Sequence, residues 1–219
     1  METLRILWAP NEEFPRLLKA GGTRWAVGTV SLLAFLNLIT TLINLNSGVL
    51  QLEQQYFPDV PRDVLQATQQ AMKVLTPVAA ATYPFITWLV LGVLMYLTGR
   101  VFGGTGRLSS MLVVSGVSQL PLIVGLVAGS VLAAAASTTS PDSPAAAFLG
   151  SLSFSLLIGQ FMWMAWLAVT GIRHVHQLDP RKSTASCGLS CLGCLGVFFI
   201  LMFVAAIILS LVITTRVSS

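Results

Sequence analysis

Three cysteines toward the end of the chain have the spacing of a known redox site. Cys187, Cys191 and Cys194 form the pattern CxxxCxxC, which binds an iron–sulfur cluster in radical enzymes that use S-adenosylmethionine. Those enzymes enclose the cluster in a soluble barrel, for which this chain has no room. Positions i, i+4 and i+7 share one face of a helix. We therefore interpret the thiols as small packing residues, with S-acylation as the alternative, and expect neither a metal nor another cofactor.

Two histidines lie close together in the motif RHVHQ. His174 and His176 are two positions apart, so their side chains would diverge on a helix. The sequence contains no HExxH motif and no neighbouring carboxylate cluster that would complete a metal site. We predict that both are solvated side chains of a loop.

A glycine-rich loop at 99–110 has a superficial likeness to a phosphate-binding loop. Gly103, Gly104 and Gly106 lie in it, between Arg100 and Arg107. No GxxxxGK[ST] motif is present, and no predicted strand precedes the loop. We interpret it as a tight turn whose arginines contact lipid phosphates.

Four amides lie inside otherwise apolar stretches, whereas acidic residues and histidines are absent from those stretches. Such amides either form hydrogen bonds between membrane helices or line a solute path, and the first role is the commoner one. Proton-coupled transporters and membrane metalloenzymes carry ionisable groups at depth. The pattern therefore favours a protein that is not an enzyme. The four residues are Asn37, Asn44, Gln119 and Gln160.

The elements that must position these residues follow from the distribution of charge. The chain is 55% hydrophobic and 9% charged, against about 25% charged residues in a soluble domain. Charged residues leave five long gaps, and a helix satisfies its own backbone hydrogen bonds in lipid. We predict an all-α integral membrane domain at 25–216. Its five transmembrane helices lie at about 25–45, 77–97, 111–134, 148–172 and 192–213, with proline bends at Pro84 and Pro121.

The first 24 residues form a separate amphipathic segment. Trp8 belongs to one short apolar stripe and Phe14 to a second, with basic residues beside them. This pattern predicts interfacial helices at 1–24 that lie in the headgroup region on the cytoplasmic side; a loosely ordered tail is the alternative. A further amphipathic helix, opened by Pro61, is expected to lie along the membrane surface.

The basic residues predict the orientation. Cytoplasmic loops of membrane proteins carry an excess of Lys and Arg. Threading the five spans places nine basic residues on one side and three on the other, so we expect the N-terminus in the cytoplasm and the C-terminus outside. The nine are Arg5, Arg16, Lys19, Arg24, Arg100, Arg107, Arg173, Arg181 and Lys182, and the three are Arg62, Lys73 and Arg216.

Two segments together resemble the Yip family, the Ypt-interacting-protein domain, in its bacterial form. One is the opening LRILWAPNEEFPRLLKAGGTRWAV, and the other is the hairpin TWLVLGVLMYLTGRVFGGTGRLSSMLVVSGVSQLPLIVGL. The DLYGP segment and GY motifs of the eukaryotic members are missing, so their role in binding small membrane GTPases is not carried over. The resemblance implies a five-span protein of a bacterial cytoplasmic membrane without known enzyme activity.

The function that we expect is that of an adaptor or accessory subunit. It would contact membrane lipids and a membrane-protein partner, with a transporter among the candidates, and would not bind nucleic acid. A small transporter or channel subunit is the alternative, and an enzyme that uses the three cysteines is a weaker third. The residues expected to contact partner or lipid are Trp8, Phe14, Arg100, Arg107, Arg173, Arg181 and Lys182.

Overall fold

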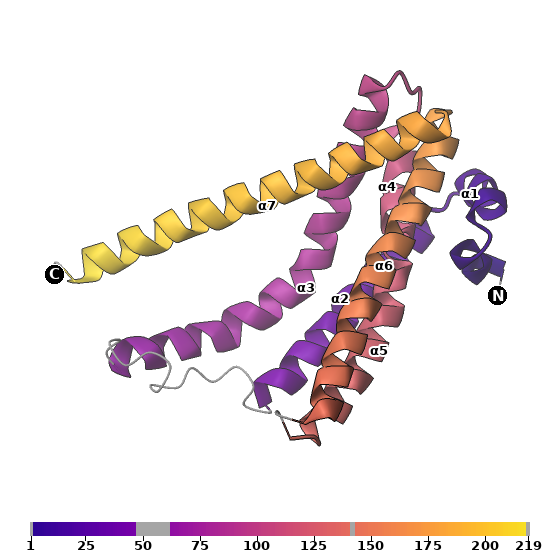
Figure 1. The fold of residues 1–219 in the computed structure, drawn as a ribbon. Coiled ribbons are helices and arrows are strands. Elements are labelled where there is room, and N and C mark those ends of the chain that lie inside the picture. Colours follow the sequence, from indigo (N-terminus) through magenta and orange to yellow (C-terminus); the bar gives the residue numbers. More distant parts are fainter. Residues whose placement is uncertain (1, 47–61, 141–142, 218–219) are drawn as a thin grey trace.

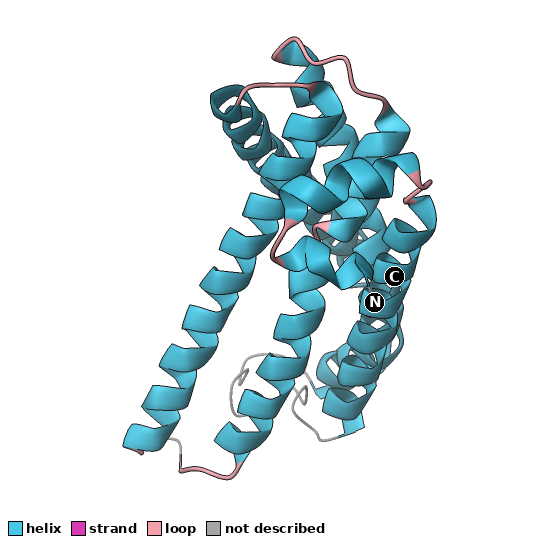
Figure 2. Ribbon diagram, turned by 90° about the vertical axis from the view of Figure 1, so that its right-hand side faces the viewer, coloured by secondary structure: helices cyan, strands magenta, loops and turns pink. Residues whose placement is uncertain are grey.

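The computed structural model describes residues 2–46, 62–140 and 143–217, and every element in these ranges is a helix (Figures 1 and 2). The described residues contain no β-strand, and the backbone hydrogen bonds are made within each helix. The elements are η1 (Glu2–Leu7), α1 (Pro10–Lys19), α2 (Thr23–Asn46), α3 (Arg62–Val101), α4 (Leu108–Val117), α5 (Leu120–Ser137), α6 (Pro144–His176) and α7 (Pro180–Val217).

The prediction of five membrane-spanning helices is confirmed. Within the described residues, five helical stretches are long and apolar enough to cross a membrane. A helix that is apolar on all sides suits lipid, whereas a soluble helix carries a polar face. The five stretches are Thr23–Asn46, Val64–Val101, Leu108–Ser137, Pro144–His176 and Pro180–Ile200.

Helix α3 differs from the sequence prediction. The sequence suggested a surface helix followed by a separate span at 77–97, but residues 62–101 form one continuous helix; Pro61 itself lies outside the described residues. Pro77 and Pro84 lie inside this helix, and α3 bends along its length in Figure 1. Each proline removes one backbone hydrogen bond and bends a helix without ending it when the flanking turns are well formed.

The third span is interrupted where the sequence predicted a bend. Helix α4 ends at Val117, and α5 begins at Leu120 with Pro121 in its first turn. Proline has no N–H, and its ring clashes with the carbonyl group four residues earlier. That carbonyl belongs to Val117, so the helix stops there. At the end of α4, the hydroxyl of Ser118 donates a hydrogen bond to the carbonyl of Ser115 (3.0 Å).

Helix α7 begins twelve residues before the predicted span at 192–213. Its start at Pro180 has the usual signals, because proline fits the first helical position and the Asp179 carboxylate accepts a hydrogen bond from the N–H of Lys182 (2.9 Å). Hydropathy located only the apolar part of this helix. The preceding turns are polar, and they carry the serines that pack against α3.

The buried core lies toward the end of the molecule where α3 meets α4 and α6 meets α7. Met95, Met111, Val114, Leu167 and Ile172 are nearly or completely buried there. The opposite halves of the long helices carry exposed apolar side chains such as those of Val127, Phe154 and Phe203. In a bilayer these side chains meet lipid tails, so they need no protein partner.

The N-terminal segment, η1 with α1, packs onto the side of the bundle. Ile6, Phe14 and Leu17 are buried, and α1 contacts α6 and α4. The Trp163 indole N–H donates a hydrogen bond to the carbonyl of Leu7 (2.9 Å). The apolar side that was expected to face lipid headgroups is thus largely covered by protein. Tertiary packing supplies the stability that such short helices lack alone.

Candidate functional site

Two connections that are far apart in the sequence meet at one end of the molecule. The α3–α4 loop and the α6–α7 loop lie together at the top of Figure 1. The backbone N–H of Gly106 donates a hydrogen bond to Nδ1 of His176 (3.2 Å), which joins them directly. We call this part of the molecule, residues 96–107 and 173–190, the loop end.

A buried histidine fills the centre of the loop end. The side chain of His176 is 2% exposed and lies against Gly99, Gly104 and Gly106. A Cβ atom at Gly99 or Gly104 would overlap the imidazole ring, and one at Gly106 would lie 3.0 Å from Nδ1. The prediction of solvated loop histidines is therefore wrong for His176, while His174 is half-buried in the last turn of α6.

The histidines were misplaced because the α6–α7 loop is shorter than the sequence suggested. The left-handed backbone of Gln177 (φ 55°) ends α6, and the Asp179 and Pro180 signals begin α7. Only three residues separate the helices, which places both histidines on α6. Recognising the helix start at Pro180 would have given this result from sequence alone.

The hydrogen bond at Nδ1 fixes the neutral tautomer of His176. Because Nδ1 accepts a hydrogen bond from the backbone N–H of Gly106, the ring's own proton is on Nε2. Nε2 is buried, and no hydrogen-bond partner lies near it among the described residues. The ring of Tyr96 is 6.2 Å away between centroids, and the Arg100 guanidinium carbon lies 5.4 Å from the Tyr96 ring centre. The buried histidine is thus linked to an exposed arginine through one aromatic ring.

A second polar cluster joins α3 to α7. The hydroxyl oxygen of Thr98 lies 2.8 Å from the hydroxyl oxygens of both Ser186 and Ser190, and all three residues are buried. Hydroxyl hydrogen bonds between helices hold their backbones close and satisfy groups that cannot reach water. The cluster fixes the start of α7 against α3.

The outer surface of the loop end is basic. The five basic residues that the sequence assigned to a contact surface are all exposed here. Among the described residues, the ion pairs are Arg5–Glu12 (3.9 Å) and Arg16–Glu13 (3.1 Å), both in the N-terminal segment. The loop-end basic residues have no carboxylate within salt-bridge distance in that part of the chain. They are Arg100, Arg107, Arg173, Arg181 and Lys182.

The two aromatic residues of the expected contact set have different surroundings. Trp8 is 64% exposed and is available to a partner or to lipid. Phe14 is completely buried in the core that α1 forms with the bundle. Phe14 therefore stabilises the docked segment and offers no contact surface, which corrects the sequence-based assignment.

The three cysteines differ in their exposure to solvent. Cys187 is buried in the core, Cys194 is half-buried and Cys191 is exposed. Within the described residues, no three His, Cys, Asp or Glu side chains are placed to hold a metal ion. The packing interpretation fits Cys187, and Cys191 is the thiol open to modification.

The four amides of the membrane region also have different surroundings. Asn37 is half-buried and Asn44 is exposed on α2. Gln119 is 3% exposed at the α4–α5 break, and no donor reaches its Oε1 within the described chain. The side chain of Gln160 lies directly over Gly125, where a Cβ atom would overlap it. Glycine thus allows α5 and α6 to approach closely at a polar side chain.

Comparison with known proteins identifies one family. The Yip1 domain matches residues 4–203, which include the N-terminal segment, the loop end and most of α7. No curated protein and no solved structure is significantly similar to the chain.

Proposed function

The chain belongs to the Yip1 domain family, and on this basis we propose that it is a non-enzymatic adaptor or accessory subunit of the membrane. It binds another membrane protein, for which a transporter is one candidate. We place it in a bacterial cytoplasmic membrane, with the N-terminus in the cytoplasm and the C-terminus outside. Residues 1–24 act as its cytoplasmic interfacial segment and 25–216 as its membrane domain.

The observation that supports this proposal most is the unpaired basic surface of the loop end. Within the described residues, none of these five exposed cations has a carboxylate at salt-bridge distance, so they are free to attract an acidic surface. Anionic lipid accounts for part of this charge, at about 1 kcal/mol per basic residue near the membrane. The His176 and Thr98 contacts fix the backbone beneath the surface, so its charges keep a defined arrangement, which reduces the entropy lost on binding.

Co-purification in mild detergent, followed by mass spectrometry, tests the proposal. We expect a specific membrane protein to be recovered with the wild type. The double variant Arg100→Ala/Arg107→Ala should reduce this recovery about fivefold or more, since two exposed charge contacts contribute about 1–2 kcal/mol. Arg62→Ala/Lys73→Ala removes two charges from the other end of α3 and is the matched control, with recovery unchanged.

The aromatic contact is tested separately with Trp8→Ala. Trp8 is exposed, so this change leaves the docked segment intact, whereas deletion of the first ten residues would also remove Ile6 and Leu7 from the core.

Equal loss of the partner in both double variants, Arg100→Ala/Arg107→Ala and Arg62→Ala/Lys73→Ala, would contradict the proposed surface. If the protein alone moved a solute across liposomes at a rate abolished by Gln160→Leu, the transporter function would replace the adaptor function.

A further inference from the structure

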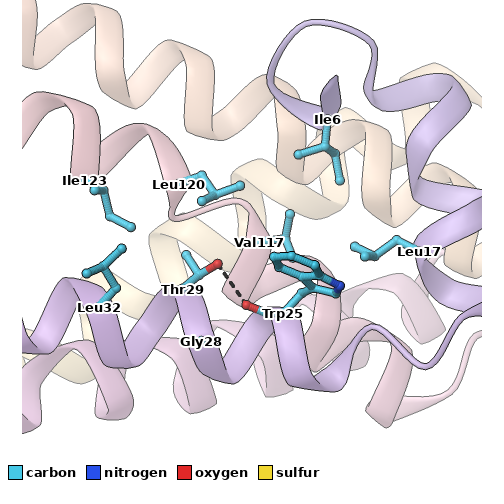
Figure 3. Close-up of a pocket in the computed structure, with 9 residues that line it drawn as sticks. All are labelled: Ile6, Leu17, Trp25, Gly28, Thr29, Leu32, Val117, Leu120 and Ile123. Carbon is cyan, nitrogen blue, oxygen red and sulfur yellow. Dashed lines mark hydrogen bonds between the residues drawn. The ribbon is translucent and has the colours of Figure 1, made fainter. Parts of the chain in front are cut away.

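A cavity lies where the N-terminal segment covers the first turns of α2. Its volume is about 300 Å³. Figure 3 shows Ile6 and Leu17 from the N-terminal segment and Trp25 from α2, with Val117 and Leu120 from the two sides of the α4–α5 break. Leu32 and Ile123 lie together at the end away from Leu17. The helix break and the docked segment together create this space.

The walls of the cavity are apolar. Two polar groups lie among them: the indole N–H of Trp25, and the hydroxyl of Thr29, which donates its hydrogen bond to the carbonyl of Trp25 (2.9 Å) and has no further proton to offer. A buried water typically makes about three hydrogen bonds, which is more than these two groups supply. The cavity is therefore suited to a hydrocarbon ligand.

Three tryptophans lie in or near the wall of the cavity. Trp25 forms part of the wall, and the carbonyl of Leu7, next to the wall residue Ile6, accepts the indole N–H of Trp163. The indole nitrogen of Trp88 lies beside Gly116, next to the wall residue Val117. Of the three, Trp25 is the exposed one, and because exposed tryptophans gather at the headgroup level of membranes, we place this level at the wall formed by Trp25.

From that level the cavity extends into the hydrocarbon region. Seven residues of helix separate Trp25 from Leu32, a descent of about 10 Å along α2. Trp25 is 46% exposed and Leu32 is 47% exposed, so the walls continue into the lipid-facing surface of the bundle. In the sequence, Arg24 directly precedes the wall residue Trp25, and Lys19 follows the wall residue Leu17 by two positions. Both are exposed, and they supply positive charge toward the headgroup end.

We propose that the cavity binds the upper part of one acyl chain of a phospholipid, with the phosphate group beside Arg24. The volume equals about ten water molecules of liquid, which accommodates a chain segment of about ten methylene groups. The apolar walls, the tryptophan level, the open connection to lipid and the cations at the upper end all match this one ligand. A protein helix would not fit, because its diameter with side chains is about 10 Å.

A glycine in the wall allows the cavity to be filled without disturbing the fold. Gly28 lines the cavity, and a Cβ atom there would have no neighbouring atom within 4 Å. Gly28→Phe therefore places a ring in the space meant for the acyl chain. Gly159→Phe is the matched control, because Gly159 is also an exposed helical glycine with open space at Cβ and does not line the cavity.

Native mass spectrometry of the purified protein is the first test. After washing in detergent, the wild type and Gly159→Phe should keep one phospholipid per chain, and Gly28→Phe should keep at least tenfold less. Arg24→Gln should lower retention of anionic phospholipid severalfold, while Arg62→Gln should not. The proposal is overturned if the wild type keeps no lipid, or if both phenylalanine variants keep as much as the wild type. It is also overturned if the wild type is a lipid-free dimer that Gly28→Phe dissociates.

Photo-crosslinking of the unmodified protein provides a second test that requires no variant. A phospholipid with a diazirine in the upper half of one acyl chain is incorporated into vesicles with the wild-type chain. Crosslinks should concentrate on the peptides that contain Leu32 and Ile123. An even distribution over the exposed apolar residues of α5, α6 and α7 would show bulk lipid contact only and would refute a defined site.

Discussion

At the scale of single residues, the loop end depends on the absence of three side chains. Gly99 and Gly104 leave the volume that the imidazole of His176 occupies, Gly106 leaves room for Val175, and Gly106 also supplies the N–H for Nδ1. A polar ring at a helix terminus is thereby buried with one hydrogen bond made and one donor left over. The shape of the loop and the identity of the histidine determine each other.

This dependence is testable with a double-mutant cycle. Gly104→Ala should destabilise the protein by about 1–3 kcal/mol, because the added methyl group overlaps the imidazole ring. His176→Ala is destabilising in its own right, since it leaves a cavity. In the His176→Ala background, adding Gly104→Ala should cost little, because the obstacle is gone. Thermal unfolding in detergent measures all four proteins.

Gly150→Ala is the control for the backbone effect of replacing glycine. A Cβ atom at Gly150 meets nothing within 4 Å, so this variant should be as stable as the wild type or slightly more stable. Strictly additive effects of Gly104→Ala and His176→Ala would show that the two residues do not interact.

At the scale of elements, the sequence located the membrane-spanning helices but not where they begin. A hydropathy pattern locates the residues that contact lipid. The ends of a helix are set instead by its capping residues and backbone hydrogen bonds, which can lie outside the apolar stretch. For this reason α3 extends upstream to Arg62 and α7 begins at Pro180, before the apolar residues start. Proline, by contrast, acts locally, so the sequence located the irregularity at Pro121, although it predicted a bend and the structure has a break between two helices.

The docking of the N-terminal segment could not be derived from the sequence. An amphipathic helix has the same pattern whether its apolar side meets lipid or protein. The deciding contact, Trp163 to the carbonyl of Leu7, joins residues 156 positions apart. Only the tertiary structure shows that Phe14 is buried and that Trp8 is exposed.

Replacing Trp163 with Phe should loosen this docked segment. The variant removes one hydrogen bond of about 1 kcal/mol while it keeps an aromatic ring in place. Amide hydrogen exchange across residues 5–19 should then be about fivefold faster. Trp166→Phe, at a more exposed position one turn away, should leave exchange unchanged. An unaltered exchange rate in Trp163→Phe would mean that the buried apolar residues alone hold the segment.

At the scale of the whole molecule, the proposed orientation predicts which ends can be reached from outside the cell. In a background without native cysteines, a single cysteine at Ser140 should react with an impermeant thiol reagent, and one at Thr105 should not. Both positions are exposed loop residues at opposite ends of the bundle. A cysteine at Gln54, outside the described residues, should react as at Ser140. Labelling at Thr105 in intact cells would reverse the orientation.

The length of α7 gives its attachment a mechanical consequence. The helix is held at its start, where Ser186 and Ser190 meet Thr98 and Gly193 meets Leu94, and the remainder leads away from the other helices (Figure 1). About 24 residues extend beyond Gly193, which makes an arm of about 36 Å. A pivot of 10° at the hydroxyl cluster would swing the tip of this arm by about 6 Å. A small rotation at the loop end would therefore displace the far end of α7 by a larger distance.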